Sequence, residues 1–260
     1  MKENLTIVKV GGAVVEDEAQ LARLLKDFVA IEGHKILVHG GGRRATKVAG
    51  ALGIESRMVD GRRITDAKML EVVTMVYGGL VNKSLVARLQ ACGINALGLT
   101  GADMNAVQSH KRPLKNGIDF GFVGDVDHVN GYALQLLLQQ GITPVMAPLT
   151  HDGQGNILNT NADTMASEVA KALSQFFNVT LIYCFEKPGV LRNPADEASL
   201  IPVITREEFS GYVADGTVSG GMIPKLENAL AAVDHGVSKV IITLATAIDG
   251  KHGTVIQRRK

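Results

Sequence analysis

The sequence has few cysteines and no recognisable targeting or spanning segment. Its 260 residues include only two cysteines, Cys92 and Cys184, so a disulfide framework is excluded and a reducing cytosol is the expected environment. The amino terminus enters an apolar strand pattern without the charged-then-apolar order of a signal peptide. No apolar run approaches the roughly 18–20 residues that a membrane-spanning helix needs. We therefore expect a cytoplasmic protein with no membrane partner.

An excess of charge of one sign is also lacking. Lys and Arg number 27 and Asp and Glu number 26, which leaves a formal net charge of +1. This balance predicts neither a nucleic-acid surface nor a polybasic membrane patch. The chain contains no G-x-x-x-x-G-K-[ST] loop, no G-x-G-x-x-G turn, no H-E-x-x-H and no G-x-S-x-G, which argues against several nucleotide-binding, metalloprotease and serine hydrolase classes. The histidines show no metal-ligand spacing, so no protein-held metal is expected.

What the chain does contain is a nearly continuous alternation of strand and helix patterns. Two hairpins interrupt the alternation, at 55–66 and at 106–124. Strands are predicted at 5–10, 35–39, 94–99, 142–148, 179–184 and 239–244. Helices are predicted at 17–31, 43–52, 66–92, 130–140, 161–175 and after 220. Such alternation is typical of an α/β protein with a parallel sheet covered on both faces.

Two of these strands end in glycines. The first ends as Lys9-Val10-Gly11-Gly12 and the second as His39-Gly40-Gly41-Gly42. Glycine lets successive backbone N–H groups crowd around an anion, because no Cβ stands in the way. If the strands are neighbours, these turns and the Lys9 ammonium form a phosphate site. The alternatives are a strand-end lysine that reaches water and a triple glycine that only makes a tight turn.

Two later helices begin with polar motifs. Asn159-Thr160-Asn161-Ala162-Asp163 opens one helix, with Asn161 or a neighbour as a plausible cap. Gly220-Gly221-Met222-Ile223-Pro224-Lys225 introduces another, and a lysine there is unfavourable unless an anion also binds at that end. The alternatives are a helix-dipole carboxylate at Asp163, turn and cap roles for the asparagines, and a solvated lysine at Lys225.

Taken in their order along the chain, these motifs resemble the amino-acid kinase family, and the resemblance covers essentially the whole chain. The Arg63 hairpin and the Asn-x-Asn-Ala-Asp motif are the selective elements. The motifs are Lys9-Val10-Gly11-Gly12, His39-Gly40-Gly41-Gly42, Asp60-Gly61-Arg62-Arg63-Ile64-Thr65, Asn159-Thr160-Asn161-Ala162-Asp163 and Gly221-Met222-Ile223-Pro224-Lys225. The resemblance implies a three-layer αβα sandwich on a mainly parallel central sheet.

The resemblance also implies two lobes and a reaction. Residues 1–176 would bind an acyl amino acid and form a homodimer, and residues 177–260 would bind ATP. The implied reaction is ATP-dependent phosphorylation of the γ-carboxylate of N-acetyl-L-glutamate in arginine biosynthesis. Two alternatives remain open: another acceptor of the same fold, such as N-succinylglutamate or a different family substrate, and a non-catalytic nucleotide or amino-acid sensor.

The implied chemistry sets the expected catalytic residues. The acceptor carboxylate is already ionised at pH 7, so positioned cations and N–H donors matter more than a general base. Lys225 would neutralise the β-phosphate leaving group, and Asp163 would pair with both lysines without acting as a base. The transferring phosphoryl group would be held by Lys9 and by the amides of Gly11, Gly12, Gly41 and Gly42.

The resemblance extends to the substrates. Arg63 would form a bidentate pair with the substrate α-carboxylate, helped by Asn159 and Asn161. Mg²⁺ would arrive with ATP, bound mainly by phosphates and water. The expected nucleotide contacts are Glu186, Gly189, Ser219 and Gly221.

Two departures from the family pattern stand out. The nucleotide-side turn, usually Thr/Ser-Asp-x-x-Gly, is here Phe185-Glu186-Lys187-Pro188-Gly189; the hydroxyl is gone and the carboxylate is one methylene longer, so the ATP contacts of this loop should differ. The first strand also begins almost at residue 1, whereas arginine-inhibited members carry an extra amino-terminal helix that links dimers into hexamers. An arginine-insensitive homodimer is therefore expected.

Overall fold

The fold is organised around a strand near the amino terminus. A computed structural model describes residues 2–59, 61–220 and 222–258. The strand β1 (Asn4–Val10) pairs in parallel with β2 (His34–His39) on one side and with β11 (Asn178–Phe185) on the other. Its apolar, β-branched sequence suits this central place, because both faces of a parallel sheet are covered.

The central sheet has eight strands in the order β12-β14-β13-β11-β1-β2-β8-β5. The strands from β13 to β5 run in one direction, whereas β14 is antiparallel to β13, and β12 follows β14. The remaining bounds are β5 (Ala96–Leu99), β8 (Thr143–Met146), β12 (Val203–Ile204), β13 (Lys239–Leu244) and β14 (Thr254–Ile256). The mainly parallel sheet is thus confirmed.

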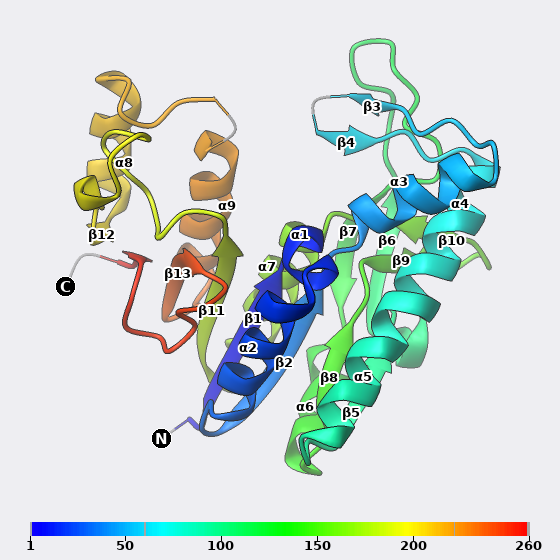
Figure 1. The fold of residues 1–260 in the computed structure, drawn as a ribbon, viewed down its shortest axis with the longest axis horizontal. Coiled ribbons are helices and arrows are strands. Elements are labelled where there is room, and N and C mark those ends of the chain that lie inside the picture. The colour runs from blue at the N-terminus through cyan, green and yellow to red at the C-terminus, as the bar shows by residue number, and fades with distance from the viewer. Residues whose placement is uncertain (1, 60, 221, 259–260) are drawn as a thin grey trace.

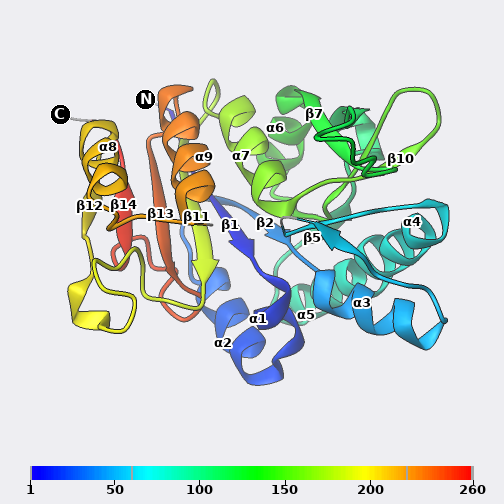
Figure 2. The same ribbon diagram turned by 90° about the horizontal axis from the view of Figure 1, so that it is seen from above.

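Helices cover both faces of this sheet (Figures 1 and 2). Side chains alternate along β1, so Leu5 and Ile7 join one buried cluster while Val8 and Val10 join the other. The first cluster includes α6 (Gly131–Gln139), α7 (Ala162–Leu173), α8 (Arg206–Ala214) and α9 (Met222–Asp234). The second includes α1 (Gly12–Glu16), α2 (Glu18–Val29), α3 (Gly42–Ala51), α4 (Ala67–Val73) and α5 (Asn82–Ala91). The αβα sandwich is therefore confirmed.

Two smaller sheets flank the carboxyl end of the central strands (Figure 1). One is the short hairpin of β3 (Met58–Val59) and β4 (Arg62–Arg63). The other has the order β10-β9-β6-β7, formed by β6 (Val107–Lys111), β7 (Gly124–Val129), β9 (Leu149–His151) and β10 (Ile157–Asn159). The hairpin predicted at 106–124 is present, although β7 extends to Val129, and Asn116 and Gly117 take positive φ angles of 51° and 76° at its turn.

Several short elements escape prediction from sequence. Helix α1 follows directly from the glycine turn. The strands β10, β12 and β14 contain only two or three residues each, too few to show a periodic pattern of apolar residues. Short 3₁₀ segments occupy Asp103–Asn105 and Glu197–Ser199. Helix α8 has a capping box of Thr205 and Glu208, a signal that the sequence carries and that a search for caps would have found.

The helical stretch predicted at 66–92 is continuous but changes its winding. Between α4 and α5 lies η1 (Thr74–Val81), a π-helix that contains Gly78 and Gly79. Among the described helices, Ala67–Ala91 is long and apolar enough to cross a membrane by those two criteria alone, although 44% of its most apolar window is buried inside the protein. Core helices of soluble proteins meet the same criteria. The expectation that no stretch is long and apolar enough was therefore too strict.

The central sheet continues across the lobe boundary expected between residues 176 and 177. That point lies between α7 and β11, and β11 pairs along its length with β1 from Asn4↔Asn178 to Lys9↔Tyr183. The two halves of the chain therefore share one sheet, and their functional division stays a prediction.

Candidate active site

Two glycine turns meet where β1 and β2 end. Val10 pairs with His39 at the ends of the two strands, and the Gly40 amide donates to the Val10 carbonyl at 2.8 Å. A Cβ on Gly12 would lie 3.5 Å from the amide nitrogens of Gly41 and Gly42. Helix α1 begins at Gly12 and α3 at Gly42, and neither has a side-chain cap. The predicted proximity of the turns is confirmed, and both carry helix-terminal N–H groups that suit an anion.

Lys9 lies inside the protein beside these turns. Its ammonium forms an ion pair with Asp163 Oδ1 at 2.7 Å, so the alternative of a lysine reaching freely into water is wrong. Asp163 stands in the first turn of α7, where the Asn161 side chain caps the helix by accepting from the amides of Asp163 at 2.8 Å and Thr164 at 3.1 Å. The predicted cap is confirmed, and it fixes the carboxylate opposite Lys9.

Lys225 reaches the same region from another helix. It lies in the first turn of α9, and its Nζ is 4.1 Å from the ring centroid of Phe185. The Lys9 Nζ lies 6.0 Å from that ring. Within the part of the chain that the structure describes, Asp163 forms an ion pair with Lys9 but not with Lys225. The two lysines therefore flank one aromatic ring, and the expected second ion pair is absent from this arrangement.

The expected acceptor-side residues share one cavity of about 180 Å³. Gly41, Gly42, Arg63, Asn159 and Asn161 all line it, which places together a group that the sequence had separated by up to 120 positions.

Arg63 is buried at the wall of this cavity. Its Nη2 donates to the Gly42 carbonyl at 2.9 Å and to Thr46 Oγ1 at 3.0 Å, and its Nη1 donates to Ser56 Oγ. These bonds fix the guanidinium beside the glycine turn. Asn159 is also fixed, since its Nδ2 donates to Thr65 Oγ1 at 3.0 Å.

A second arginine lines the cavity and was not singled out from the sequence as a binding residue. Arg62 precedes Arg63 in β4, so the two side chains alternate along the strand, yet both border the same cavity. Partial burial lowers the pKa of Arg62, and the nearby Arg112 guanidinium lowers it further, while Asp125 opposes both effects. Two guanidinium groups thus border the cavity, and that of Arg63 already donates to three acceptors of the protein.

A buried histidine network supports the second glycine turn. His39 is fully buried, and burial lowers its pKa to about 4, so the ring is neutral at physiological pH. Its Nδ1 lies 3.0 Å from the Gly40 carbonyl, and its Nε2 lies 3.1 Å from Asn82 Nδ2, which also donates to the Val145 carbonyl at 2.8 Å. A neutral ring protonated at Nδ1 satisfies both contacts. The absence of metal-ligand spacing among the histidines gave no indication of this link, because Asn82 lies 43 residues after His39.

The π-helix η1, which ends directly before Asn82, also contacts this turn. Tyr77 of η1 packs so closely on Gly41 that a Cβ there would lie 2.7 Å from a Tyr77 ring carbon. Burial raises the pKa of Tyr77, against the opposing effect of Arg63 nearby. A side chain at position 41 would therefore collide with the Tyr77 ring, so glycine is needed there in addition to any role of its amide.

The expected nucleotide-side residues are less concentrated. Glu186 follows β11 and meets the exposed Arg43 of α3 at 3.3 Å. Gly189 packs against Thr254, where a Cβ would lie 2.6 Å from Oγ1, so tight packing alone accounts for glycine there. Ser219 is exposed, and its carbonyl accepts from the Met222 amide at 3.3 Å. Gly221 lies outside the described residues.

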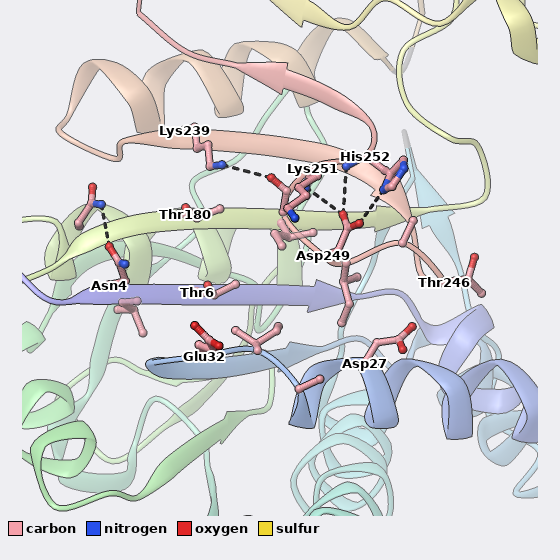
Figure 3. A pocket seen from close by; sticks show the side chains of 18 of the residues that line it. Asn4, Thr6, Asp27, Glu32, Thr180, Lys239, Thr246, Asp249, Lys251 and His252 are labelled. Carbon is pink, nitrogen blue, oxygen red and sulfur yellow. Dashed lines mark hydrogen bonds and ion pairs between the residues drawn. The ribbon is translucent and has the colours of Figure 1, made fainter.

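A larger cavity, of about 1060 Å³, opens beside the amino-terminal residues of β1 and β11 and extends along the loop that follows β13 (Figure 3). Two of its charged residues have partners within the cavity wall: Lys239 Nζ donates to the Gly250 carbonyl at 3.2 Å, and the carboxylate of Asp249 accepts from the amides of Lys251 and His252 at 2.9 and 3.1 Å. Partial burial raises the pKa of Asp249, but these bonds outweigh it and lower that pKa to about 2. None of the expected site residues lines this cavity.

Comparison with known proteins settles the family. A model of the amino acid kinase family matches residues 4–244. The chain belongs to the amino acid kinase family. One relative, an acetylglutamate kinase of Bacteroides thetaiotaomicron, is 66% identical over 258 residues, covering 99% of this chain and 100% of that protein.

Solved structures agree with this membership of the amino acid kinase family. The protein smu.665 of Streptococcus mutans UA159 is 27% identical, with a TM-score of 0.76 over 98% of this chain and 99% of its own. An N-acetylglutamate synthase of Neisseria gonorrhoeae, complexed with coenzyme A and N-acetyl-glutamate, is 21% identical and has a TM-score of 0.84, with 100% of this chain and 61% of that chain covered. The latter likeness shows the fold alone.

Proposed function

We propose that this protein transfers the γ-phosphoryl group of ATP to the γ-carboxylate of N-acetyl-L-glutamate, giving N-acetylglutamyl 5-phosphate in arginine biosynthesis. The observation that carries this proposal is the Lys9–Asp163 ion pair at 2.7 Å beside two glycine turns that meet. The 66% identity to an acetylglutamate kinase over the whole of both chains supports the choice of acceptor. A cytoplasmic enzyme fits this role.

The reaction joins two anions, so it needs charge stabilisation more than a base. A γ-carboxylate oxygen forms a bond to the γ-phosphorus while the bond to the β–γ bridging oxygen breaks, and ADP leaves with that electron pair. Lys9 and the amides of Gly11, Gly12, Gly41 and Gly42 would stabilise the transferring group. Lys225 would neutralise charge on the leaving β-phosphate, and Asp163 would hold Lys9 in place.

Recognition of the acceptor would rest on the cavity of about 180 Å³. The buried Arg63 would exchange its Nη2 bonds to Gly42 and Thr46 for a bidentate pair with the α-carboxylate, because guanidinium and carboxylate groups match in such a pair. Asn159 and Asn161 would add polar contacts. The Asn161 oxygen is occupied by the helix cap, so its amide N–H groups are the part left to bind substrate.

ATP would bind on the side formed by residues 177–260, with contacts from Glu186, Gly189, Ser219 and Gly221. Mg²⁺ would be held by phosphate oxygens and water, as this ion prefers.

A second acceptor is favoured by one observation. Arg62 lines the same cavity as Arg63, and a second guanidinium there could bind a further carboxylate on the acyl group. N-succinylglutamate carries such a carboxylate, whereas N-acetylglutamate does not. Replacing Arg62 by Ala should then weaken use of N-succinylglutamate more than use of N-acetylglutamate.

We also propose a homodimer formed by the long helix and the neighbouring edge strand. Met75 and Leu80 of η1 are 54% and 47% exposed, and Leu97 of the edge strand β5 is 37% exposed. An apolar face of this kind is better explained by a second copy than by water. Leu80→Lys should convert the dimer to a monomer in light scattering after gel filtration, and Leu136→Lys on α6 serves as the matched control.

A coupled ADP-release assay tests the function. It would use ATP and Mg²⁺ with N-acetylglutamate, N-succinylglutamate, glutamate and aspartate in turn, and hydroxylamine to trap the acyl phosphate. Turnover with an N-acylglutamate supports the reaction and identifies the acyl group. Turnover with a free amino acid alone would show that the acceptor is an unacylated amino acid. Binding of these ligands without turnover would favour a sensor.

A further inference from the structure

Phe185 stands at a position where the sequence departs from the family pattern. It is the last residue of β11, two positions after Tyr183, which pairs with Lys9 in the sheet. The rings of Tyr183 and Phe185 are 6.2 Å apart and inclined by 30°. The half-buried Phe185 also packs against the core under α7 and α9. Its ring is therefore held in place from the sheet side, at the edge where both lysines arrive.

The position of Lys225 is electrostatically unfavourable, and the Phe185 ring offsets this cost. Its ammonium belongs to the first turn of α9, where the positive end of the helix dipole opposes a cation. It forms no ion pair with any residue that the structure describes, whereas Lys9 has Asp163. The Phe185 centroid lies 4.1 Å from the Lys225 Nζ, well within the distance at which the negative face of a ring attracts a cation.

We propose that Phe185 is a positioning residue: its ring holds the Lys225 ammonium at the phosphate-transfer site by a cation–π contact. This inference rests on the proposed role of Lys225 toward ATP. In this role the ring acts through Lys225, because Lys9 lies farther away, at 6.0 Å, and is already held by Asp163. It also orders the lysine before nucleotide binds, so less side-chain entropy is lost on binding.

A fluorination series at position 185 tests the contact. Phe185 would be replaced in the full-length protein by 4-fluoro-, 3,5-difluoro- and 3,4,5-trifluorophenylalanine, which weaken the negative face of the ring in steps while nearly keeping its shape. We expect kcat/KM for ATP to fall stepwise, by about two- to fivefold at trifluorophenylalanine. The KM for the N-acylglutamate should stay constant, because its cavity is lined by other residues.

Conventional variants complete the series. Phe185→Tyr keeps a ring and should stay within about twofold of the wild type, while Phe185→Leu should lose at least as much as trifluorophenylalanine. In a Lys225→Ala background, Phe185→Leu should cause no further loss, since the 4.1 Å contact is already gone and the more distant Lys9 is held by Asp163. As a matched control, the same fluorination at Phe28, whose ring lies 5.8 Å from Lys35 Nζ away from the site, should leave the kinetics unchanged.

The outcomes separate this inference from the proposed function. A wild-type protein without N-acylglutamate kinase activity, or a Lys225→Ala variant with wild-type kcat, would overturn the proposed function or the role of Lys225. If the wild type is active and Lys225→Ala lowers kcat, but fluorination leaves kcat/KM for ATP unchanged, the proposed role of Phe185 is wrong. A loss in Phe185→Leu that persists in the Lys225→Ala background would show a purely structural role for the ring.

Discussion

The cavities toward the two ends of the central sheet differ in the groups that border them, a difference that cavity volume does not show. Toward the amino end of the strands lies the cavity of about 1060 Å³, and at the carboxyl end lies one of about 180 Å³. The larger cavity is bordered by charges of both signs, among them Arg23 and Asp27, and its Asp249 carboxylate already accepts from two amides. The smaller one is bordered by the guanidinium groups of Arg62 and Arg63 and by the glycine turn at the N-terminus of α3. Cations and a helix N-terminus that converge on one cavity identify the site better than empty space does.

The largest contrast is expected between two lysines. Lys9→Ala removes the cation proposed to stabilise the transferring group, so kcat should fall by about a thousandfold, or about 4 kcal/mol. Lys239→Ala, at the cavity of the amino end, should change kcat by less than about twofold. Steady-state ADP release measures both. Near-normal turnover in Lys9→Ala would contradict the claim that the reaction takes place at the carboxyl end of the sheet.

The buried histidine at the carboxyl end should make stability depend on pH. The pKa of His39 is lowered by burial to about 4, so above its ordinary pKa near 6.5 the ring is neutral in both folded and unfolded chains. As pH falls from 6.5 to 4 the unfolded chain takes up the proton first, and about 3 kcal/mol of stability is lost. Urea unfolding at pH 7 and pH 4 would measure this.

A matched variant isolates the contribution of that histidine. His39→Gln should show a smaller loss of unfolding free energy between the two pH values, since it does not titrate. Asp249 at the amino end acts at lower pH, because its pKa is lowered to about 2 and its contribution is lost only as pH falls below about 4. Equal losses in wild type and His39→Gln would contradict the assignment.

A smaller difference between the two ends is expected in the KM for the acceptor substrate. Arg63→Lys keeps the charge but loses the fork that fits a carboxylate, so the KM for the N-acylglutamate should rise about thirtyfold with little change in kcat. Arg23→Lys, at the larger cavity, should leave the KM unchanged. An unaltered KM in Arg63→Lys would exclude the proposed pairing.

The smallest effect is expected at the amino end itself. Asp249→Asn weakens hydrogen bonds within an exposed loop, so it should lower the free energy of unfolding by less than about 1 kcal/mol and leave kcat and both KM values unchanged. Thermal unfolding and the same ADP-release assay would check this. A loss of activity would mean that the larger cavity contributes to the reaction after all.

The sequence predicted those parts of the site that depend on local chemistry. Glycine after a strand indicates close backbone approach, and Asn161 before a helix indicates a cap, so the turns and the α7 terminus were predictable. The pairing of Lys9 with Asp163 also agrees with the expected arrangement.

What escaped prediction depends on contacts between distant segments. The His39 ring is partnered by Asn82, 43 residues later, and the Lys225 ammonium by a ring 40 residues earlier. Neither contact has a pattern at its own position. The π-helix escaped for another reason, because the pattern of apolar residues through Gly78-Gly79 does not distinguish its winding from α.

The change of winding in the long helix makes the site sensitive to the length of the chain. Tyr77 and Asn82 lie five residues apart, within and just after η1, and contact Gly41 and His39 respectively. Each residue advances an α-helix by about 100°, so deleting one residue between them, such as Gly79, would turn Asn82 away from His39 by roughly that angle. An insertion or deletion here would therefore act on a glycine turn more than 30 residues earlier without replacing any side chain that touches it. The spacing of this helix is itself part of the site.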